Sequence, residues 1–288
     1  MTLINPPAPH AVAATLAPAA RPARGGHYHW RSVLRSEWTK MRSVRSTTWS
    51  LVVMFVLSIG IGILATATEA SRWSHASLAD RILFDPTSLS LTGLLFGQLC
   101  IGVLGVIVMS SEYGTGTIRA TLAAVPNRPL VLAAKAAVFA ALALAVGEII
   151  SFLSFYIGQG FLSGSAPQAV LGQPGVLRAV VGGGLYIAVL GLFAMGLATI
   201  IRHTAGAITA FATLLLILPL ISQALPSSIN DVIARYLPAN IGVVMMTVHS
   251  GFRSDAPMFA PWTGFAVLFG YAAVAMLLGG WLMTRRDA

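Results

Sequence analysis

Residues 47–68, TTWSLVVMFVLSIGIGILATAT, run for 22 residues without a charged side chain. As an α-helix, a segment of this length extends about 33 Å, and the hydrocarbon core of a bilayer is about 30 Å thick. The helix of a soluble core seldom needs so long an apolar run. The segment therefore predicts a helix that crosses a membrane.

Five further apolar stretches have a similar length. They cover about residues 89–110, 136–162, 179–201, 204–225 and 262–283. The whole chain is 56% hydrophobic and only 9% charged, whereas ordinary soluble proteins carry about 25% charged residues. The predicted fold class is an all-α membrane protein with six transmembrane helices.

The distribution of Lys and Arg predicts the orientation of these helices. Seven precede the first span, three lie in the second connection, one in the fourth and two in the C-terminal tail, so thirteen fall on one side against five on the other. Because Lys and Arg are retained in the cytoplasm, both chain ends are expected there. The net charge of +9 then follows the inner membrane edge, which makes anionic lipids the expected partner and argues against nucleic acid.

The region before the first span divides in two. Residues 1–26 are rich in Pro and Ala and predict a disordered cytoplasmic tail. Residues 27–46 predict an amphipathic helix that lies in the membrane interface, with an apolar stripe at steps of three and four and basic residues opposite. The stripe is formed by Trp30, Leu34, Trp38 and Met41. Such a helix is either a plain anchor or an elbow helix that also braces a cytoplasmic partner.

The sequence lacks the motifs that several kinds of chemistry require. The chain has no GxxxxGK[ST], HExxH or GxSxG sequence, and its single cysteine, Cys100, can form neither an intrachain disulfide nor a CxxC metal site. We therefore expect no catalytic residues, no bound cofactor and no metal in this chain, and no enzymatic activity of its own.

Glu148 is the one acidic residue well inside a predicted span. A charge at that depth costs on the order of 3 kcal/mol even on lenient insertion scales. Its carboxyl group is therefore expected to be neutral, paired or facing water. Two interpretations remain: a hydrogen bond that stabilises the bundle, or a role in binding substrate or carrying a proton.

Glycines recur at a spacing close to four in the second and fourth spans. Small residues on one helix face allow a second helix to approach closely, so packing is the expected role, with pore lining as the alternative. Residues 226–261, before the last span, are too polar and proline-rich to cross. They predict short helices at the outer face, as a lid or as an ordinary packed loop.

Residues 109–135, MSSEYGTGTIRATLAAVPNRPLVLAAK, form an unusually polar connection between the second and third spans. Gly114 and Gly116 permit a sharp turn. TIRATLAAV then predicts a helix of two turns, which Pro126 and Pro129 end. A short helix at the cytoplasmic membrane edge suits a docking surface for a soluble subunit, although an amphipathic loop without a partner has the same pattern.

The same connection resembles the Glu-Tyr-x-x-Gly-Thr cytoplasmic segment of the type 2 ABC transporter permeases. Glu112, Tyr113, Gly116 and Thr117 match this motif without a gap. The preceding sequence LRSEWTKMRSVRSTTWSL is similar to the elbow-helix entry of bacterial members. The resemblance extends over about residues 30–286.

The resemblance implies a permease domain over residues 47–286 that pairs with a second copy or a sister permease. Two separate ATP-binding-cassette ATPase subunits, carrying ATP and Mg²⁺, would dock from the cytoplasm on a coupling helix at about residues 112–125. The residues assigned to this contact are Glu112, Tyr113, Gly114, Gly116, Thr117, Ile118, Arg119 and Leu122. The implied function is ATP-driven transport in the plasma membrane of a bacterium, as an exporter of small amphipathic compounds or lipids.

Two other functions fit the residues themselves. A membrane scaffold could recruit a soluble partner through the same connection without moving any substrate. A proton-coupled secondary transporter could use Glu148 as its proton carrier, although the two repeated halves that such transporters often have are not evident in the sequence.

Overall fold

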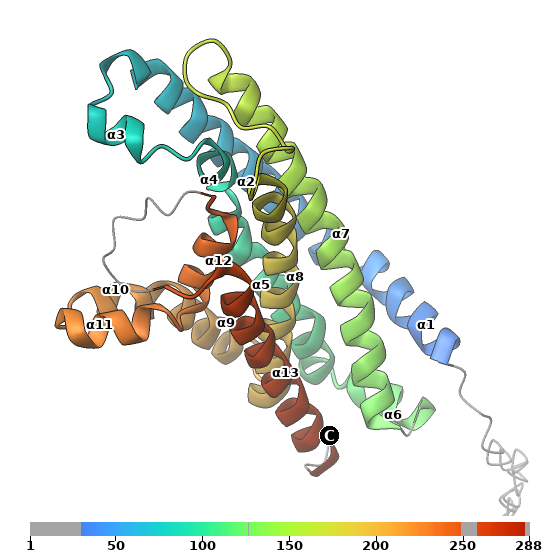
Figure 1. Cartoon of the computed structure of the whole chain (residues 1–288). Coiled ribbons are helices and arrows are strands. Elements are labelled where there is room, and N and C mark those ends of the chain that lie inside the picture. Colours follow the sequence, from blue (N-terminus) through green and yellow to red (C-terminus); the bar gives the residue numbers. More distant parts are fainter. Residues whose placement is uncertain (1–29, 126, 249–257, 286–288) are drawn as a thin grey trace, which may run out of the picture.

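The computed structural model describes residues 30–125, 127–248 and 258–285. All regular secondary structure in these ranges is helical (Figure 1). The elements are α1 (Trp30–Ser43), α2 (Arg45–Arg72), η1 (Trp73–His75), α3 (Leu78–Ile82), α4 (Pro86–Leu91), α5 (Leu94–Gly114), α6 (Thr117–Ala124), α7 (Arg128–Leu162), α8 (Val176–Ile201), α9 (Thr204–Ala212), η2 (Thr213–Ile217), α10 (Leu218–Gln223), α11 (Ser227–Ala234), α12 (Pro238–Met246) and α13 (Pro261–Arg285). The predicted tail and the start of the predicted interfacial helix lie outside the described residues.

Within residues 30–125, 127–248 and 258–285, six helical segments are long and apolar enough to cross a membrane. They are Arg45–His75, Pro86–Gly114, Arg128–Leu162, Val176–Ile201, Thr204–Gln223 and Pro261–Arg285. For the described part of the chain, this confirms the prediction of an all-helical fold with six long apolar helices, and it is compatible with a multi-pass membrane protein.

The third span begins earlier than the sequence suggested. Helix α7 starts at Arg128 because the Asn127 side chain accepts a hydrogen bond from the Leu130 amide, at 3.1 Å, and Pro129 lies in its first turn. Proline is favoured there, since its missing N–H is not needed in the first turn. Pro129 therefore helps to start α7, and Lys135, which the sequence placed in the connection, lies two turns inside the helix.

Helix α8 is the central element of the bundle. It contacts α5, α7 and α13 along its length and also packs against α9 and α12. Glycines make these contacts close: a methyl group on Gly105 of α5 would lie 2.5 Å from the Gly191 carbonyl oxygen, and one on Gly196 would lie 2.8 Å from the Ala275 side chain. These glycines serve the packing of helices, as small residues do in membrane bundles.

Helix α2 packs on the outside of α5 and α7. The closest approach is at Gly93, where a side-chain carbon would lie 1.7 Å from the Ser58 carbonyl oxygen. Gln159 of α7 adds a buried polar link, since its amide nitrogen donates to the Pro86 carbonyl and the Ser90 hydroxyl at 3.0 and 2.9 Å. These bonds satisfy the amide of Gln159, which would otherwise be buried without a partner.

The fifth span differs from the other five. It is assembled from α9, the π-helical turn η2 and α10, and only 17% of its most apolar window is buried. Figure 1 shows α10 and α11 standing out sideways from the bundle. The short helices expected before the last span are present as α11 and α12. Helix α12 is held to α8 by Arg178, whose guanidinium donates to the carbonyls of Met245 and Thr247 at 2.9 and 2.7 Å.

Helices α1 and α6, the junction of α8 with α9, and the C-terminal end of α13 lie at one end of the bundle (Figure 1). Two arginines join these parts. Arg128 donates to the Met283 carbonyl at 2.6 Å, and Arg202 donates to the Leu282 carbonyl at 3.2 Å. Both bonds satisfy carbonyls in the last turn of α13, which have no partner within the helix. We call this end of the molecule the α6 end.

Candidate functional site

The connection between α5 and α7 is an ordered turn followed by a helix. Helix α5 continues to Gly114, and Gly116 has a φ of 70°, in the left-handed region that glycine adopts without strain. The Thr115 hydroxyl donates to the Ser111 carbonyl at 2.8 Å and lies 2.9 Å from the Thr117 hydroxyl. The chain therefore reverses within a few residues and enters α6, so the predicted short helix is present.

Helix α6 has an inner and an outer face. Ile118 is only 2% exposed and packs into the hydrophobic core, and Leu122 lies half-buried beside it. The outer face is exposed and consists of Thr117, Arg119, Ala120, Ala123 and Ala124. A partner could touch this outer face, whereas Ile118 holds the helix against the bundle.

Glu112 belongs to a cluster of ionised side chains that joins four helices. Lys135 of α7 donates to Glu112 of α5 at 2.7 Å and to Glu37 of α1 at 2.5 Å. Lys40 of α1 donates to Glu37 at 2.7 Å, to Glu112 at 3.1 Å and to the Thr121 hydroxyl of α6 at 3.4 Å. We call Glu37, Lys40, Glu112 and Lys135 the four-charge cluster.

The four-charge cluster is deeply buried, apart from Lys40. Glu37 is 1% exposed, Lys135 3% and Glu112 8%. Burial costs each ion several kcal/mol, and only close opposite charges and hydrogen bonds offset this cost. Half-burial lowers the pKa of Lys40, but its bonds with Glu37 and Glu112 outweigh this effect and raise the pKa above its ordinary value. Lys40 is therefore charged at neutral pH.

Sequence reasoning missed three of the four charges. Glu37 and Lys40 were passed over within a basic helix, and Lys135 was placed in a loop. One signal was available: Glu37 stands four residues after Val33 and four before Met41, so a helix puts this acid on an apolar face. Both Val33 and Met41 are buried in the structure. An acid on a buried face needs a buried partner, which Lys135 provides.

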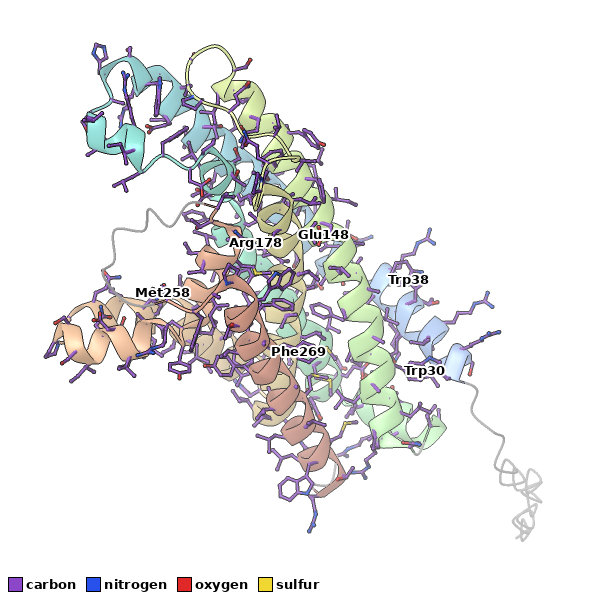
Figure 2. The ribbon with its side chains drawn as sticks, in the orientation of Figure 1. Trp30, Trp38, Glu148, Arg178, Met258 and Phe269 are labelled. Atoms are coloured by element: carbon purple, nitrogen blue, oxygen red, sulfur yellow. The ribbon has the colours of Figure 1, made fainter. Side chains whose placement is uncertain are left out.

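The residues of the predicted apolar stripe of α1 lie in two different environments, one buried and one exposed. Met41 is buried, and Leu34 lies half-buried and packs against the core. Trp30 and Trp38, labelled in Figure 2, are 41% and 46% exposed. Part of the stripe therefore attaches α1 to the bundle, and the two indole rings are open to lipid or to a partner.

Tyr113 links the connection to the centre of the bundle. Its ring lies 5.2 Å from the guanidinium carbon of Arg202, which follows α8. A cation over an aromatic face is attracted by the ring quadrupole. The Glu-Tyr pair of the motif therefore has two partners in the structure, since Glu112 contacts α1 and α7 while Tyr113 contacts the α8–α9 junction.

Glu148 lies near the middle of α7, as Figure 2 shows. Along this helix it is about 20 Å from Lys135 of the four-charge cluster, at 1.5 Å per residue. Its carboxyl group packs against α8, where a side-chain carbon on Gly184 would come within 2.6 Å of Oε1. Its Oε2 is buried and has no hydrogen-bond partner among the described residues. The described residues therefore offer no partner to Oε2, and both interpretations of Glu148 stay predictions.

Comparisons with other proteins add no family to this description. A search against models of protein families finds none that matches the chain, and a search of curated proteins finds no relative. The resemblance to type 2 ABC permeases thus depends on the motifs alone. Within the described residues, no group of three or more His, Cys, Asp or Glu side chains could hold a metal ion.

Proposed function

We propose that this chain is the transmembrane permease subunit of an ATP-driven transporter of the type 2 ABC class, an exporter of small amphipathic compounds or lipids. In this proposal the outer face of α6 is the surface on which a separate ATPase subunit docks. ATP and Mg²⁺ belong to that partner, and the α6 end faces the cytoplasm.

The observation that carries the proposal is the attachment of α6. A docking helix can transmit force only if it is fixed to the helices that must move. Helix α6 is fixed by the buried Ile118, by the short turn at Gly116, and by Thr121, which bonds to Lys40 of the four-charge cluster. Its outer face nevertheless stays exposed. A helix that is attached to the bundle and also exposed suits a docking element that transmits force better than it suits a loop without a partner.

The position of α8 supports the need for a second permease copy. Its most apolar window is 67% buried, and it fills the centre of the bundle. In a single copy, α8 thus occupies the position in which a substrate path through the bundle would lie. In the proposed transporter, the substrate path lies between two permeases, and ATP binding changes which face of the membrane this path opens to, because the ATPase pair binds the two states unequally.

The outer face of α6 gives the proposal a direct test. The full chain, tagged and purified from its host membrane, is expected to bring down a protein with an ATP-binding phosphate loop. Ala120→Trp places a large side chain on the exposed face and is expected to abolish this recovery. Ala79→Trp, an exposed alanine of α3 at the other end of the molecule, is the matched control and should leave recovery unchanged.

Equal recovery by both variants would refute docking on α6. Glu112 and Ile118 are less suitable positions for this test, because both are buried. Substitutions there would disturb the attachment of α6 as well as any contact with a partner. A loss of recovery could not then be assigned to the docking surface.

Glu148 favours a second candidate function, a proton-coupled secondary transporter. Its Oε2 has no partner among the described residues, and an acidic group in the middle of an apolar span is the kind of group that carries protons in such proteins. Reconstituted vesicles separate the two functions. Transport driven by a proton gradient without ATP, and lost in Glu148→Gln, would support the second candidate and contradict the first.

A further inference from the structure

An apolar groove of about 650 Å³ lies between α7 and α13. Both helices pack along α8 and reach the α6 end of the molecule (Figure 1), but they make little contact with each other. Small residues keep the space between them open: Ala133 and Ala136 of α7, and Ala272, Ala273 and Gly280 of α13. Ligand pockets in proteins commonly have volumes of about 300–1,000 Å³, so the groove is large enough for a ligand.

The groove is also long enough for a lipid chain. Its wall on α13 extends from Phe269 to Thr284, which is about 22 Å at 1.5 Å per residue. One leaflet supplies about half of a hydrocarbon core that is about 30 Å thick. Phe269, Leu277 and Trp281 of this wall are each more than half exposed, so the groove opens on the outside of the bundle. A lipid chain can therefore enter it from the side.

The α6 end of the groove is positively charged. The guanidinium carbon of Arg285 lies 5.3 Å from the centre of the ring of Trp281, a wall residue. Arg285 is exposed and forms no ion pair within the part of the chain that the structure describes. Arg128, which donates to the carbonyl of Met283 at 2.6 Å, adds a second positive charge at the same turn of α13. Helix α13 contains no acidic residue, and none lies within the first five turns of α7.

The apolar wall and the charged end together indicate an anionic lipid. A guanidinium group forms paired hydrogen bonds with a phosphate, and a tryptophan such as Trp281 is the residue type that gathers at the level of lipid headgroups. A soluble anion would gain nothing from the apolar wall. A second copy of this chain fits less well, since a two-fold pair presents the same surface twice and brings both sets of arginines to one level of the membrane.

We propose that the groove between α7 and α13 binds one anionic phospholipid from the leaflet at the α6 end. The phosphate pairs with Arg285 beside Trp281, and one acyl chain lies along the small residues of the groove. The bound lipid joins α7 to α13, which otherwise contact each other little. This inference is independent of the proposed transport function, because it concerns the purified chain without any ATPase.

The test compares lipids that differ in headgroup charge. The purified full chain is mixed with phosphatidylglycerol, phosphatidylethanolamine or phosphatidylcholine of identical acyl chains, and bound lipid is counted by native mass spectrometry. Phosphatidylglycerol is anionic, whereas the other two carry no net charge. We expect one phosphatidylglycerol per chain, bound about tenfold more tightly than either neutral lipid, because each nearby basic residue favours an anionic headgroup severalfold. Equal retention of the three lipids would overturn the proposal.

Two variants with matched controls locate the site. Ala133→Trp fills the groove from an exposed position of α7, and Arg285→Gln removes the charge at its end. Both are expected to abolish the preference for phosphatidylglycerol. Ala141→Trp, an exposed alanine of α7 outside the groove, and Arg31→Gln, an exposed arginine of α1, should retain it.

Two results would contradict this location of the site. A preference that persists in both Ala133→Trp and Arg285→Gln would show that the lipid binds elsewhere. The same mass spectra report the oligomeric state. If Ala133→Trp separates a dimer into single chains and leaves lipid binding unchanged, the groove is an interface between copies and not a lipid site.

Discussion

The four-charge cluster and Glu148 both place ionisable groups among apolar helices, but they differ in how these groups are paired. In the cluster, each charge has opposite charges within 3.1 Å, contributed by α1, α5 and α7. Glu148 Oε2 has no hydrogen-bond partner among the described residues, and no ion pair of Glu148 is found there. The charges of the cluster are therefore compensated within the structure, whereas the carboxyl group of Glu148 must be neutral or must receive its partner from outside the described residues.

The largest effect is expected at Lys135. Lys135→Met leaves Glu37 and Glu112 buried beside each other with only Lys40 between them. Breaking a buried ion pair costs about 3–5 kcal/mol, because the remaining charge is uncompensated. The free energy of unfolding in detergent should fall by this amount, and yield from the membrane should fall with it.

A double substitution is the control for this prediction. Glu37→Leu combined with Lys135→Met removes one opposite-charge pair and leaves Lys40 with Glu112. Replacing a buried pair by apolar residues is often nearly neutral. The double variant should therefore be more stable than Lys135→Met alone. If instead the two losses add, the charges act independently and the cluster is not the unit that we describe.

Glu148→Leu is expected to stabilise the protein, whereas Lys135→Met destabilises it. It removes a carboxyl group that has no described partner, and the free energy of unfolding should rise by up to about 3 kcal/mol, the cost of an acid in mid-membrane. The measurement is the same unfolding experiment. A marked loss of stability in Glu148→Leu would contradict the comparison, because it would mean that Glu148 has a partner within the folded chain.

The smallest effect is expected at Thr121. Its hydroxyl is the most distant contact of Lys40, at 3.4 Å, and Lys40 is 38% exposed to solvent. Thr121→Val keeps the branched shape and should cost about 0.5 kcal/mol, the lower limit for a hydrogen bond. A cost similar to that of Lys135→Met would place the centre of the cluster at α6 and not at α7.

The spans could be predicted from sequence because each depends on a local property, the length of an apolar run. Residues 47–68, for example, lie wholly within α2. The sequence placed the start of the third span after Lys135, whereas α7 starts at Arg128, and the difference has a physical reason. A lysine normally marks the end of a span, but Lys135 forms an ion pair with Glu37, which is 98 positions away in the chain. No local pattern contains such a pairing.

The candidate site, like the spans, could be predicted only where it depends on local sequence. The glycine turn and the short helix α6 followed from Gly116 and TIRATLAAV, because turn and helix propensities are local. The division of that helix into a buried Ile118 and an exposed Ala120 required the position of the bundle. The groove between α7 and α13 was not predictable, since its walls come from parts of the chain that are far apart.

The central claim, that the outer face of α6 is the docking surface of an ATPase, is tested most directly by site-specific photo-cross-linking. A photoreactive amino acid is placed at position 120, and at position 79 as control, in the chain purified with its ATPase partner. We expect cross-links to the ATPase from position 120 and none from position 79. An ATPase that is present in the complex but is cross-linked only from position 79, or from both positions equally, would contradict it.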